Sequence, residues 1–326
     1  MTIVTERPDS AADNVPPPGG VFAEHMPPRK PSPAASRPAK IAAPALERFL
    51  SLMLVMVSVT ILALLANLVL VSPVQHYASQ NRLYQDIRLA LAEGSAPTGP
   101  VNPDGTLVEP GTALGVLYAP IIGIGHEVMV EGTSAAQTME GIGHRRDTVL
   151  PCQVGTSVLM ARSGAYGGVG QAFTKLVPGD KFSVTVTQGS CTYEVISARR
   201  PGDQAPSAPA AREGRLTLTT ASGAPFMPTE VYRVDAKLVT DAFDHPSVAF
   251  PTGALPSSEA AMGTDTSNLF ALVLLLELLV GVAIGVSWLW RRWGRWQTWI
   301  VGAPAIIAVG LLSATAINQW LLPNLL

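Results

Sequence analysis

Three long apolar runs limit what this chain of 326 residues can fold into more than any other feature. Each run is long enough to cross a hydrocarbon core roughly 30 Å thick, which takes about 20 helical residues. Hydrophobic residues make up 48% of the chain and charged residues only 14%, a smaller charged share than soluble domains carry. We therefore expect three transmembrane helices, over residues 46–72, 268–290 and 298–322.

Basic residues near the ends of these runs predict their orientation, because flanking Lys and Arg stay on the cytoplasmic side of a membrane. Five precede the first run and three separate the second from the third: Arg29, Lys30, Arg37, Lys40 and Arg48, then Arg291, Arg292 and Arg295. We expect a multi-pass plasma-membrane protein whose N-terminus and RRWGRW loop are cytoplasmic. Residues from about 72 to 268 and the segment Pro323 to Leu326 are then extracellular.

The rest of the chain divides by composition. Residues 1–45 are rich in Pro, Ala and Ser and lack a periodic apolar pattern, which predicts a disordered cytoplasmic tail. Residues 73–113 hold the stretch QNRLYQDIRLALAE and then a Gly- and Pro-rich stretch, which predicts a juxtamembrane helix and a linker. Residues 244–267 are predicted to form a second linker, because Pro, Gly, Ser and Thr are frequent there.

Short β-like runs separated by turns, among them KFSVTVTQ, CTYEVISAR and RLTLTTA, fill residues 114–243. Because long helices are few in this segment, we expect a compact closed β-barrel of about eight strands. The predicted fold class is a mainly β extracellular domain with three transmembrane α-helices. The net charge of -2, without a basic stripe, gives no reason to expect nucleic acid as a partner. We expect no cofactor and no metal.

Five blocks of this segment carry a family pattern when they are taken in order. They are LYAPIIGIGHEVMVEGTS (117–134), GIGHRRDTVLPCQVGTSVLM (141–160), AYGGVGQAFTKLVPGDKFSVTV (165–186), TYEVISAR (192–199) and RLTLTTASG (215–223). Together they resemble the sortases, membrane-anchored cysteine transpeptidases of Gram-positive cell envelopes, and most of all the actinobacterial housekeeping type, called class E-like. The resemblance covers residues 114–240 and implies the sortase barrel.

The resemblance implies three catalytic positions, and each carries a different residue here. A sortase uses a Cys thiolate as the nucleophile, a His to protonate the leaving amine and an Arg to stabilise the oxyanion. Ala221 stands at the nucleophile position in LTLTTA, Arg162 at the His position in MARSGAYG, and Val231 at the Arg position. Because a methyl group cannot attack a peptide bond, we expect a catalytically inactive pseudo-sortase.

Two outcomes are open for the groove of such a pseudoenzyme: it persists as a binding surface, or the barrel persists only as a scaffold. The residual groove is predicted to consist of Arg162, Ser163, Tyr166, Thr220, Ser222 and Arg233. The alternative function is an active transpeptidase or hydrolase with a relocated nucleophile, such as Ser163 or Ser222.

A relocated Ser nucleophile needs a neighbouring base. His126, His144 and His245 all lie elsewhere in the pattern, and His144 belongs to a GxGH string that is expected to form a structural turn. The sequence therefore favours loss of catalysis over relocation.

Both cysteines, Cys152 and Cys191, fall in the predicted extracellular domain, where the oxidising compartment favours disulfides. We expect them to be bonded to each other. Two free, half-buried thiols and a displaced nucleophile are the alternatives, since sequence alone does not place the two Cβ atoms within bridging range.

Glu277 is a carboxylate within the second apolar run, where an ionised group costs several kcal/mol unless it is paired or neutral. Three interpretations are open. A protonated Glu277 hydrogen-bonds Thr60, Ser313 or Thr315 within the same bundle; Glu277 contacts another membrane protein; or it belongs to a proton or ion path.

These observations predict a membrane-anchored, sortase-like protein of the cell envelope that binds or positions other envelope or membrane proteins. An active sortase and an export complex are the partner candidates. Whether any enzymatic activity remains is left open at this point.

Overall fold

The computed structural model describes residues 45–326 except 103, 225, 247–249 and 252. The predicted disordered tail, residues 1–45, lies almost entirely outside the described residues. Residues 45–52 begin helix α1, and every contact described below lies within residues 53–326.

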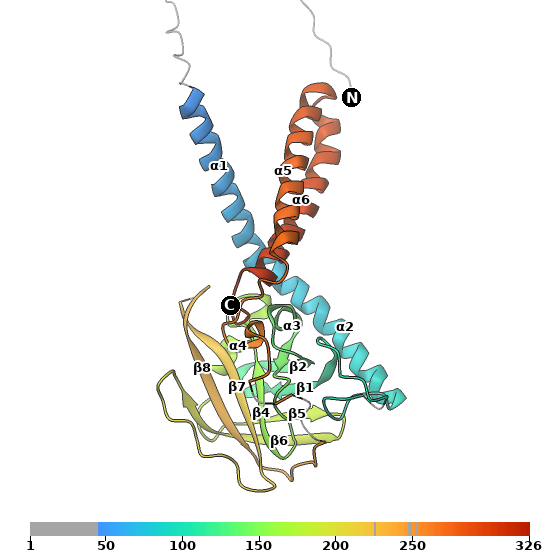
Figure 1. Cartoon of the computed structure of the whole chain (residues 1–326), viewed down its shortest axis with the longest axis vertical. Coiled ribbons are helices and arrows are strands. Elements are labelled where there is room, and N and C mark those ends of the chain that lie inside the picture. Colours follow the sequence, from blue (N-terminus) through green and yellow to red (C-terminus); the bar gives the residue numbers. More distant parts are fainter. Residues whose placement is uncertain (1–44, 103, 225, 247–249, 252) are drawn as a thin grey trace, which may run out of the picture. The chain divides into compact units, whose positions relative to one another are not determined.

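Eight strands close into a barrel in the order β1-β2-β3-β4-β7-β8-β6-β5 (Figure 1). Neighbouring strands are antiparallel, except that β2 runs parallel to β3 and β4 parallel to β7. The closed barrel predicted from the short β-like runs is confirmed. The strands are β1 (Ala113–Ala119), β2 (Ile124–Glu131), β3 (Ile142–His144), β4 (Gly155–Met160), β5 (Lys181–Val186), β6 (Gly189–Arg199), β7 (Gly214–Ala224) and β8 (Met227–Leu238).

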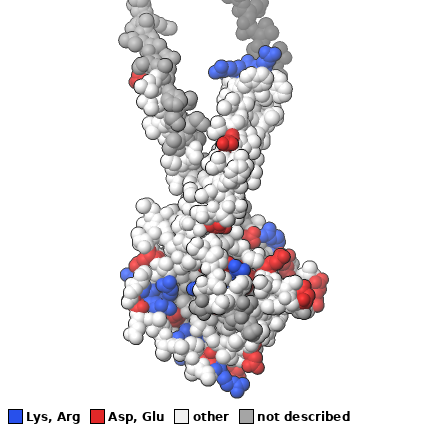
Figure 2. Space-filling view, viewed as in Figure 1, with Lys and Arg blue, Asp and Glu red and all other residues white. Residues whose placement is uncertain are grey.

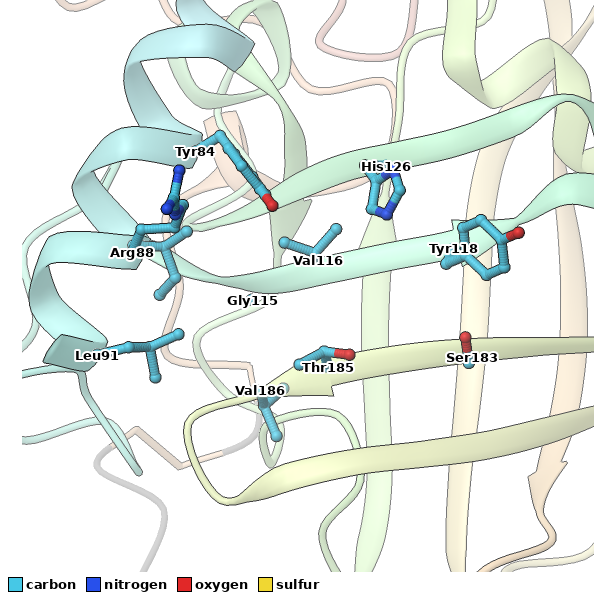
Figure 3. Close-up of a pocket in the computed structure, with 11 residues that line it drawn as sticks. Tyr84, Arg88, Leu91, Gly115, Val116, Tyr118, His126, Ser183, Thr185 and Val186 are labelled. Carbon is cyan, nitrogen blue, oxygen red and sulfur yellow. The ribbon is translucent and has the colours of Figure 1, made fainter.

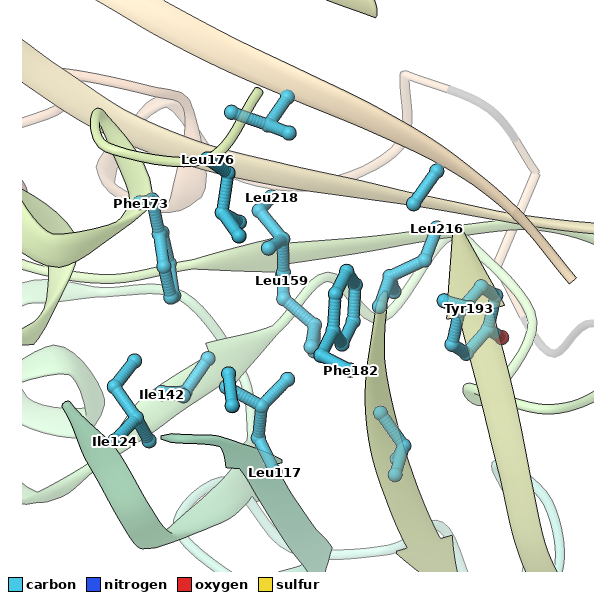
Figure 4. Close-up of a cluster of buried hydrophobic side chains, with 14 of the residues drawn as sticks. Leu117, Ile124, Ile142, Leu159, Phe173, Leu176, Phe182, Tyr193, Leu216 and Leu218 are labelled. Atoms are coloured by element: carbon cyan, nitrogen blue, oxygen red, sulfur yellow. The ribbon is translucent and has the colours of Figure 1, made fainter. Parts of the chain in front are cut away.

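Alternate residues of each strand point into the barrel and fill it (Figure 4). In β7 these are Leu216 and Leu218, while Phe182 of β5 and Tyr193 of β6 are paired and stack with ring centroids 5.7 Å apart. Burying these apolar side chains is the main source of the barrel's stability. Because side chains alternate, Ala221 of β7 lies on the outer face of the barrel wall.

A disulfide joins Cys152, in the turn before β4, to Cys191 in β6, with Cα atoms 5.8 Å apart and a sequence separation of 39. Both cysteines are buried, and the Cys152 amide donates a hydrogen bond to the Tyr193 hydroxyl at 2.7 Å. Burial raises the pKa of that phenol. The predicted bridge is confirmed, and neither cysteine is a free thiol.

Three helical segments are long and apolar enough to cross a membrane, as predicted: Thr60–Glu93, Leu269–Arg292 and Arg295–Trp320. The first combines the end of α1 (Ala45–Ala66), a π-helical stretch over Asn67–Val71 and α2 (Ser72–Glu93). The juxtamembrane helix was expected to begin near Gln80, but α2 begins at Ser72. Pro73 stands in its first turn, directly after the π-helical stretch, and has no backbone N–H to donate to the preceding turn.

Helices α5 (Leu269–Arg292) and α6 (Arg295–Trp320) form an antiparallel hairpin (Figure 1). A side chain at Gly302 would lie 2.8 Å from a methyl group of Val286, so the glycine allows the two helices to approach closely. In Figure 2 the hairpin surface is nearly free of charged atoms, whereas the barrel surface carries both signs. Two short helices, α3 (Ala135–Glu140) and α4 (Val169–Phe173), flank the barrel.

Candidate functional site

Three strands bring the predicted catalytic positions together on the outer face of the barrel. Ala221 of β7 pairs directly with Val231 of β8. On the other side of β7, the chain leaving β4 stays alongside it, because the Ala161 amide donates to the Thr219 carbonyl at 3.0 Å. The next residue is Arg162, so the positions of nucleophile, acid and oxyanion donor adjoin one another.

Ala221 is fully buried, although it lies on the outer face, because the chain covers it with its own segments. Leu325, from the segment after α6, packs against Ala221 and Met160 and is itself fully buried. Ala261 and Met262, from the linker between β8 and α5, pack against the same cluster. The space above the nucleophile position is therefore filled with side chains.

Backbone hydrogen bonds hold the segment Asn324–Leu326 against the barrel. The Ser163 amide and hydroxyl both donate to the Leu325 carbonyl, at 3.0 and 3.1 Å. The Thr138 hydroxyl donates to the Asn324 carbonyl at 2.7 Å, and the Ala165 amide donates to the Leu326 carbonyl at 3.4 Å. The barrel thus binds this segment as it would bind a peptide, through main-chain bonds and one apolar side chain.

A second segment, residues 257–263, called the strap here, locks the first in place. The side-chain Nδ2 of Asn324 donates to the Ser258 carbonyl at 3.3 Å and to the Ala260 carbonyl at 2.9 Å. The Arg146 Nε lies 3.1 Å from the Glu259 carboxylate, an ion pair that ties the strap to the turn after β3. Asn324 is completely buried between the strap and the barrel.

Arg162 extends away from solvent and is among the largest completely buried side chains. Its Nε donates to the Thr138 hydroxyl at 3.2 Å and its Nη2 to the Ala135 carbonyl at 3.1 Å. The guanidinium carbon lies 5.2 Å from the centre of the Tyr166 ring, and no carboxylate among the described residues pairs with it. Burial lowers the pKa of this guanidinium to about 10, so it remains charged at neutral pH.

These surroundings give Arg162 a structural role. A general acid works best when its pKa lies near the operating pH, and a guanidinium with a pKa of about 10 is a poor proton donor at neutral pH. Its hydrogen bonds point to α3 and to the Asn318 carbonyl of α6, which Nη2 approaches at 3.5 Å. Arg162 thus joins the barrel to the end of the α5–α6 hairpin.

The remaining predicted groove residues separate into different environments. Ser163 is bonded to Leu325, and Tyr166 accepts a hydrogen bond from the Asn318 amide at 3.1 Å. Thr220 points to the opposite side of β7 from Ala221 and donates to the Ala161 carbonyl at 3.0 Å. Ser222 and Arg233 complete the set, and neither faces a histidine.

Ser222 lies 3.4 Å from a carboxylate oxygen of Glu230 on β8, with which it pairs. Arg233 pairs with Thr219 and lies two residues beyond Val231, on the same face of β8. Burial, followed by the charge of Arg199, lowers the pKa of Arg233. By its place on β8, the Arg233 guanidinium lies near Val231, the predicted position of the oxyanion donor. Its basic neighbours are Arg199 and Arg145.

His144 is a buried structural residue. Its Nε2 lies 2.9 Å from the Val149 carbonyl and its Nδ1 2.8 Å from the Glu131 carboxylate. Burial alone would lower the pKa of His144, because it disfavours the charged ring. The charge of Glu131 and the hydrogen bonds to Glu131 and Val149 together outweigh burial, so the pKa of His144 is raised. The ring ties β3 to β2 and to the following turn, and it is not available as a base.

Glu277 lies on the exposed side of α5, and within the described part of the chain no hydrogen bond or ion pair to it is found. Ser313, one of the three hydroxyl residues considered as partners of Glu277, donates to the Val309 carbonyl at 2.8 Å. Among the described residues, no His, Cys, Asp and Glu side chains group in a way that could hold a metal ion.

Leu325, Asn324 and Thr138 are the site residues that the sequence did not indicate. Leu325 and Asn324 follow the last apolar run and carry no periodic or motif signal. Their placement depends on partners 162 and 186 residues earlier in the chain, Ser163 and Thr138.

No family model matches the chain. The chain is 33% identical over 91 residues to Sortase D of Bacillus subtilis (strain 168), a match that covers 28% of this chain and 44% of that protein. The chain therefore spans less than half the length of this curated relative.

Solved structures of sortases also align with the chain. A Clostridium perfringens Sortase D5 transpeptidase is 19% identical, with a TM-score of 0.41, over 50% of this chain and 99% of that chain. Sortase C1 from Streptococcus suis is 23% identical, with a TM-score of 0.35, over 43% of this chain and 76% of that chain. The chain is thus similar to a sortase over part of its length, and it contains a closed, eight-stranded barrel.

Proposed function

We propose that this chain is a membrane-anchored, sortase-like protein of the cell envelope, akin to the class E-like type, that has lost transpeptidase chemistry. One observation carries the proposal: Leu325 packs on Ala221, where the resemblance puts the nucleophile. No thiol is present at that position, and the chain's own leucine fills the space that a substrate carbonyl needs. The protein therefore lacks the nucleophile for catalysis, and a substrate has no access to its position.

The contacts also bear on the relocated nucleophile. Cys152 and Cys191 are bonded to each other, so neither supplies a thiolate. Ser163 is hydrogen-bonded to Leu325, and Ser222 faces a carboxylate with no imidazole beside it. A serine without a base is a weak nucleophile, which favours the inactive protein.

The orientation that we propose has the N-terminus in the cytoplasm and the barrel outside. The basic residues of the α5–α6 loop support it. So does the direct hydrogen bonding of Ser163 to Leu325, because the barrel and the segment after α6 must then share one side of the membrane. Such a chain holds the barrel close to the bilayer surface.

The role left to such a protein is to bind or position other envelope or membrane proteins, of which an active sortase and an export complex are the candidates. Glu277 supports a partner within the membrane. It shares one face of α5 with Gly281, where an added side chain would meet nothing within 4 Å. A carboxyl in hydrocarbon costs several kcal/mol, so a helix that carries a hydrogen-bond donor or a cation suits this face.

The loss of catalysis is tested with the full chain in detergent and a fluorogenic sorting-signal peptide, with an active sortase as the positive control. We expect cleavage at background level and no covalent adduct with thiol-directed or fluorophosphonate probes. Cleavage above background contradicts the proposal. Its loss in Ser222→Ala or in Ser163→Ala would then identify the relocated nucleophile.

A further inference from the structure

A groove runs between α2 and the outer faces of β1, β2 and β5. It consists of two adjoining hollows of about 460 and 370 Å³, both lined by Tyr84 and His126. We call it the α2 groove. In the strand order of the barrel, β1, β2 and β5 lie opposite β7, so this groove is distinct from the covered site at Ala221.

Aromatic rings and hydroxyl groups line the larger hollow (Figure 3). Tyr84 of α2 and Tyr118 of β1 are 38% and 42% exposed, and they stand on either side of a floor that includes Val116. The Tyr118 ring lies 5.3 Å from the His126 ring, centre to centre. Such partly exposed tyrosines present both an apolar ring face and a polar hydroxyl to a ligand.

The charge of the larger hollow has one sign. Arg88 lines the larger hollow, its guanidinium carbon lies 5.9 Å from the centre of the Tyr84 ring, and it forms no ion pair with a described carboxylate. No Asp or Glu lines that hollow. In the smaller hollow, Glu127 is already bonded to His76 at 2.6 Å. An acidic group entering the groove therefore meets one unengaged cation and no unpaired carboxylate.

The smaller hollow extends the groove along α2. Tyr77 lines it and is 70% exposed. Tyr77 and Tyr84 are seven residues apart, which is about 10 Å along a helix. A ligand that contacts both rings must be elongated.

We propose that the α2 groove binds an acidic saccharide chain. Sugar rings combine apolar faces, which pack on Tyr118, Tyr84 and Tyr77, with hydroxyl groups that bond to Ser183 and Thr185 on β5. A carboxylate or phosphate on the chain pairs with Arg88, whose planar guanidinium suits either group. The Thr185 hydroxyl already shares a hydrogen bond with the Ser190 hydroxyl at 2.9 Å, so a purely apolar ligand leaves the Ser183 hydroxyl unused. A neutral ligand leaves the Arg88 guanidinium unused. The proposal is independent of whether the site at Ala221 is catalytic.

The test uses the full chain in detergent and three probes: a trimer of galacturonic acid, a neutral galactose trimer and inorganic phosphate. We expect the acidic trimer to bind about tenfold more tightly than the neutral one, a difference of about 1.4 kcal/mol, since hydrogen bonds to a charged group are stronger than those between neutral groups. Arg88→Gln removes that preference, and Tyr118→Ala weakens both sugars. Arg82→Gln is the matched control, because Arg82 lies on the same helix but pairs with Glu140 outside the groove.

Three outcomes overturn the proposal. Neither trimer binds; or binding is unchanged in Arg88→Gln and in Tyr118→Ala; or phosphate alone displaces the acidic trimer and Tyr118→Ala has no effect, which indicates a simple anion site. Both substituted side chains are exposed, and an unchanged thermal unfolding temperature shows that each variant is folded.

Discussion

Arg162 and His144 are buried ionisable side chains whose charge is stabilised in different ways. His144 has the Glu131 carboxylate as a direct partner. Arg162 instead has a hydroxyl, backbone carbonyls and the face of Tyr166, which together offset part of the cost of burying a cation. Arg162, which the sequence predicts to stand at the acid position, is thus a structural contact, and the substitution Arg162→His would lose the hydrogen bond to the Ala135 carbonyl.

The stability of the barrel is predicted to fall as the pH rises above neutrality. The pKa of His144 is raised in the folded protein, so the folded state binds the proton more tightly than the unfolded state does. This contribution is fully present below the ordinary pKa of about 6.5 and is lost as the pH rises through the raised value. Thermal unfolding of the full chain in detergent at pH 6 and pH 9 measures the difference.

His144→Ala should reduce the pH dependence and also lower stability at pH 6 by about 3–5 kcal/mol, because it leaves Glu131 buried without its partner. The control is His245→Ala, since His245 is exposed and its hydrogen bond within residues 45–246 is to the neighbouring Pro246 carbonyl. An unfolding temperature of His144→Ala that changes with pH as strongly as that of the wild type would contradict this origin of the effect.

At the scale of elements, sequence periodicity was sufficient for the strands and for the long helices. The family resemblance placed Ala221 at the nucleophile position and Val231 at the Arg position on the following strand, and the structure pairs the two residues across β7 and β8. The alternation of β7 also separates Thr220, predicted to be a groove residue, from Ala221, predicted to stand at the nucleophile position.

The covering of the site could not be predicted in this way. Asn324 to Leu326 are too few residues to show a period, and their bonds are made with loops and short helices far away in sequence. The strap is rich in Ser, Ala and Gly, which indicates a linker and not a docked segment. Local patterns carry no information on such long-range contacts, so the occluded groove emerged only from the structure.

Asn324→Ala is predicted to loosen both covering segments. Its side-chain amide donates to three carbonyls, those of Thr133, Ser258 and Ala260, so the substitution leaves these buried acceptors unpaired. We expect faster hydrogen exchange in the strap and around Ser163, measured by mass spectrometry of the full chain. The rest of the barrel, including the β5–β6 pair, should exchange as in the wild type.

Leu325→Ala tests the same packing through the apolar side chain. Truncating a buried leucine to alanine lowers the free energy of unfolding by about 2–5 kcal/mol. Here we expect the loss of stability to be confined to the covering segments. Leu107→Ala is the matched control, because Leu107 is 51% exposed. Unchanged exchange at the strap in both Leu325→Ala and Asn324→Ala would show that these residues do not hold the cover in place.

On the scale of the whole molecule, Asn318 and Arg162 link the membrane helices to the barrel. The Asn318 side chain of α6 donates to the Tyr166 hydroxyl and, at 3.0 Å, to Asn67 in the π-helical stretch after α1. Arg162 adds its bond to the Asn318 carbonyl. The ends of two predicted membrane spans therefore meet the barrel at the residues beside Ala221, and a change in the packing of the spans reaches the covered site directly.

The orientation of the chain is the last prediction. Helix α5 has 24 residues and is therefore about 36 Å long, enough to place the α5–α6 loop across a membrane from the barrel. Since Cys152 and Cys191 are bonded, a cysteine introduced elsewhere supplies the reactive thiol in the described part of the chain. On intact cells, a membrane-impermeant maleimide should label Glu109→Cys, in the linker before β1. It should label Trp293→Cys, in the loop beside three arginines, only after the membrane is permeabilised. Labelling of Trp293→Cys on intact cells, with protection of Glu109→Cys, would place the barrel in the cytoplasm and reject an envelope function.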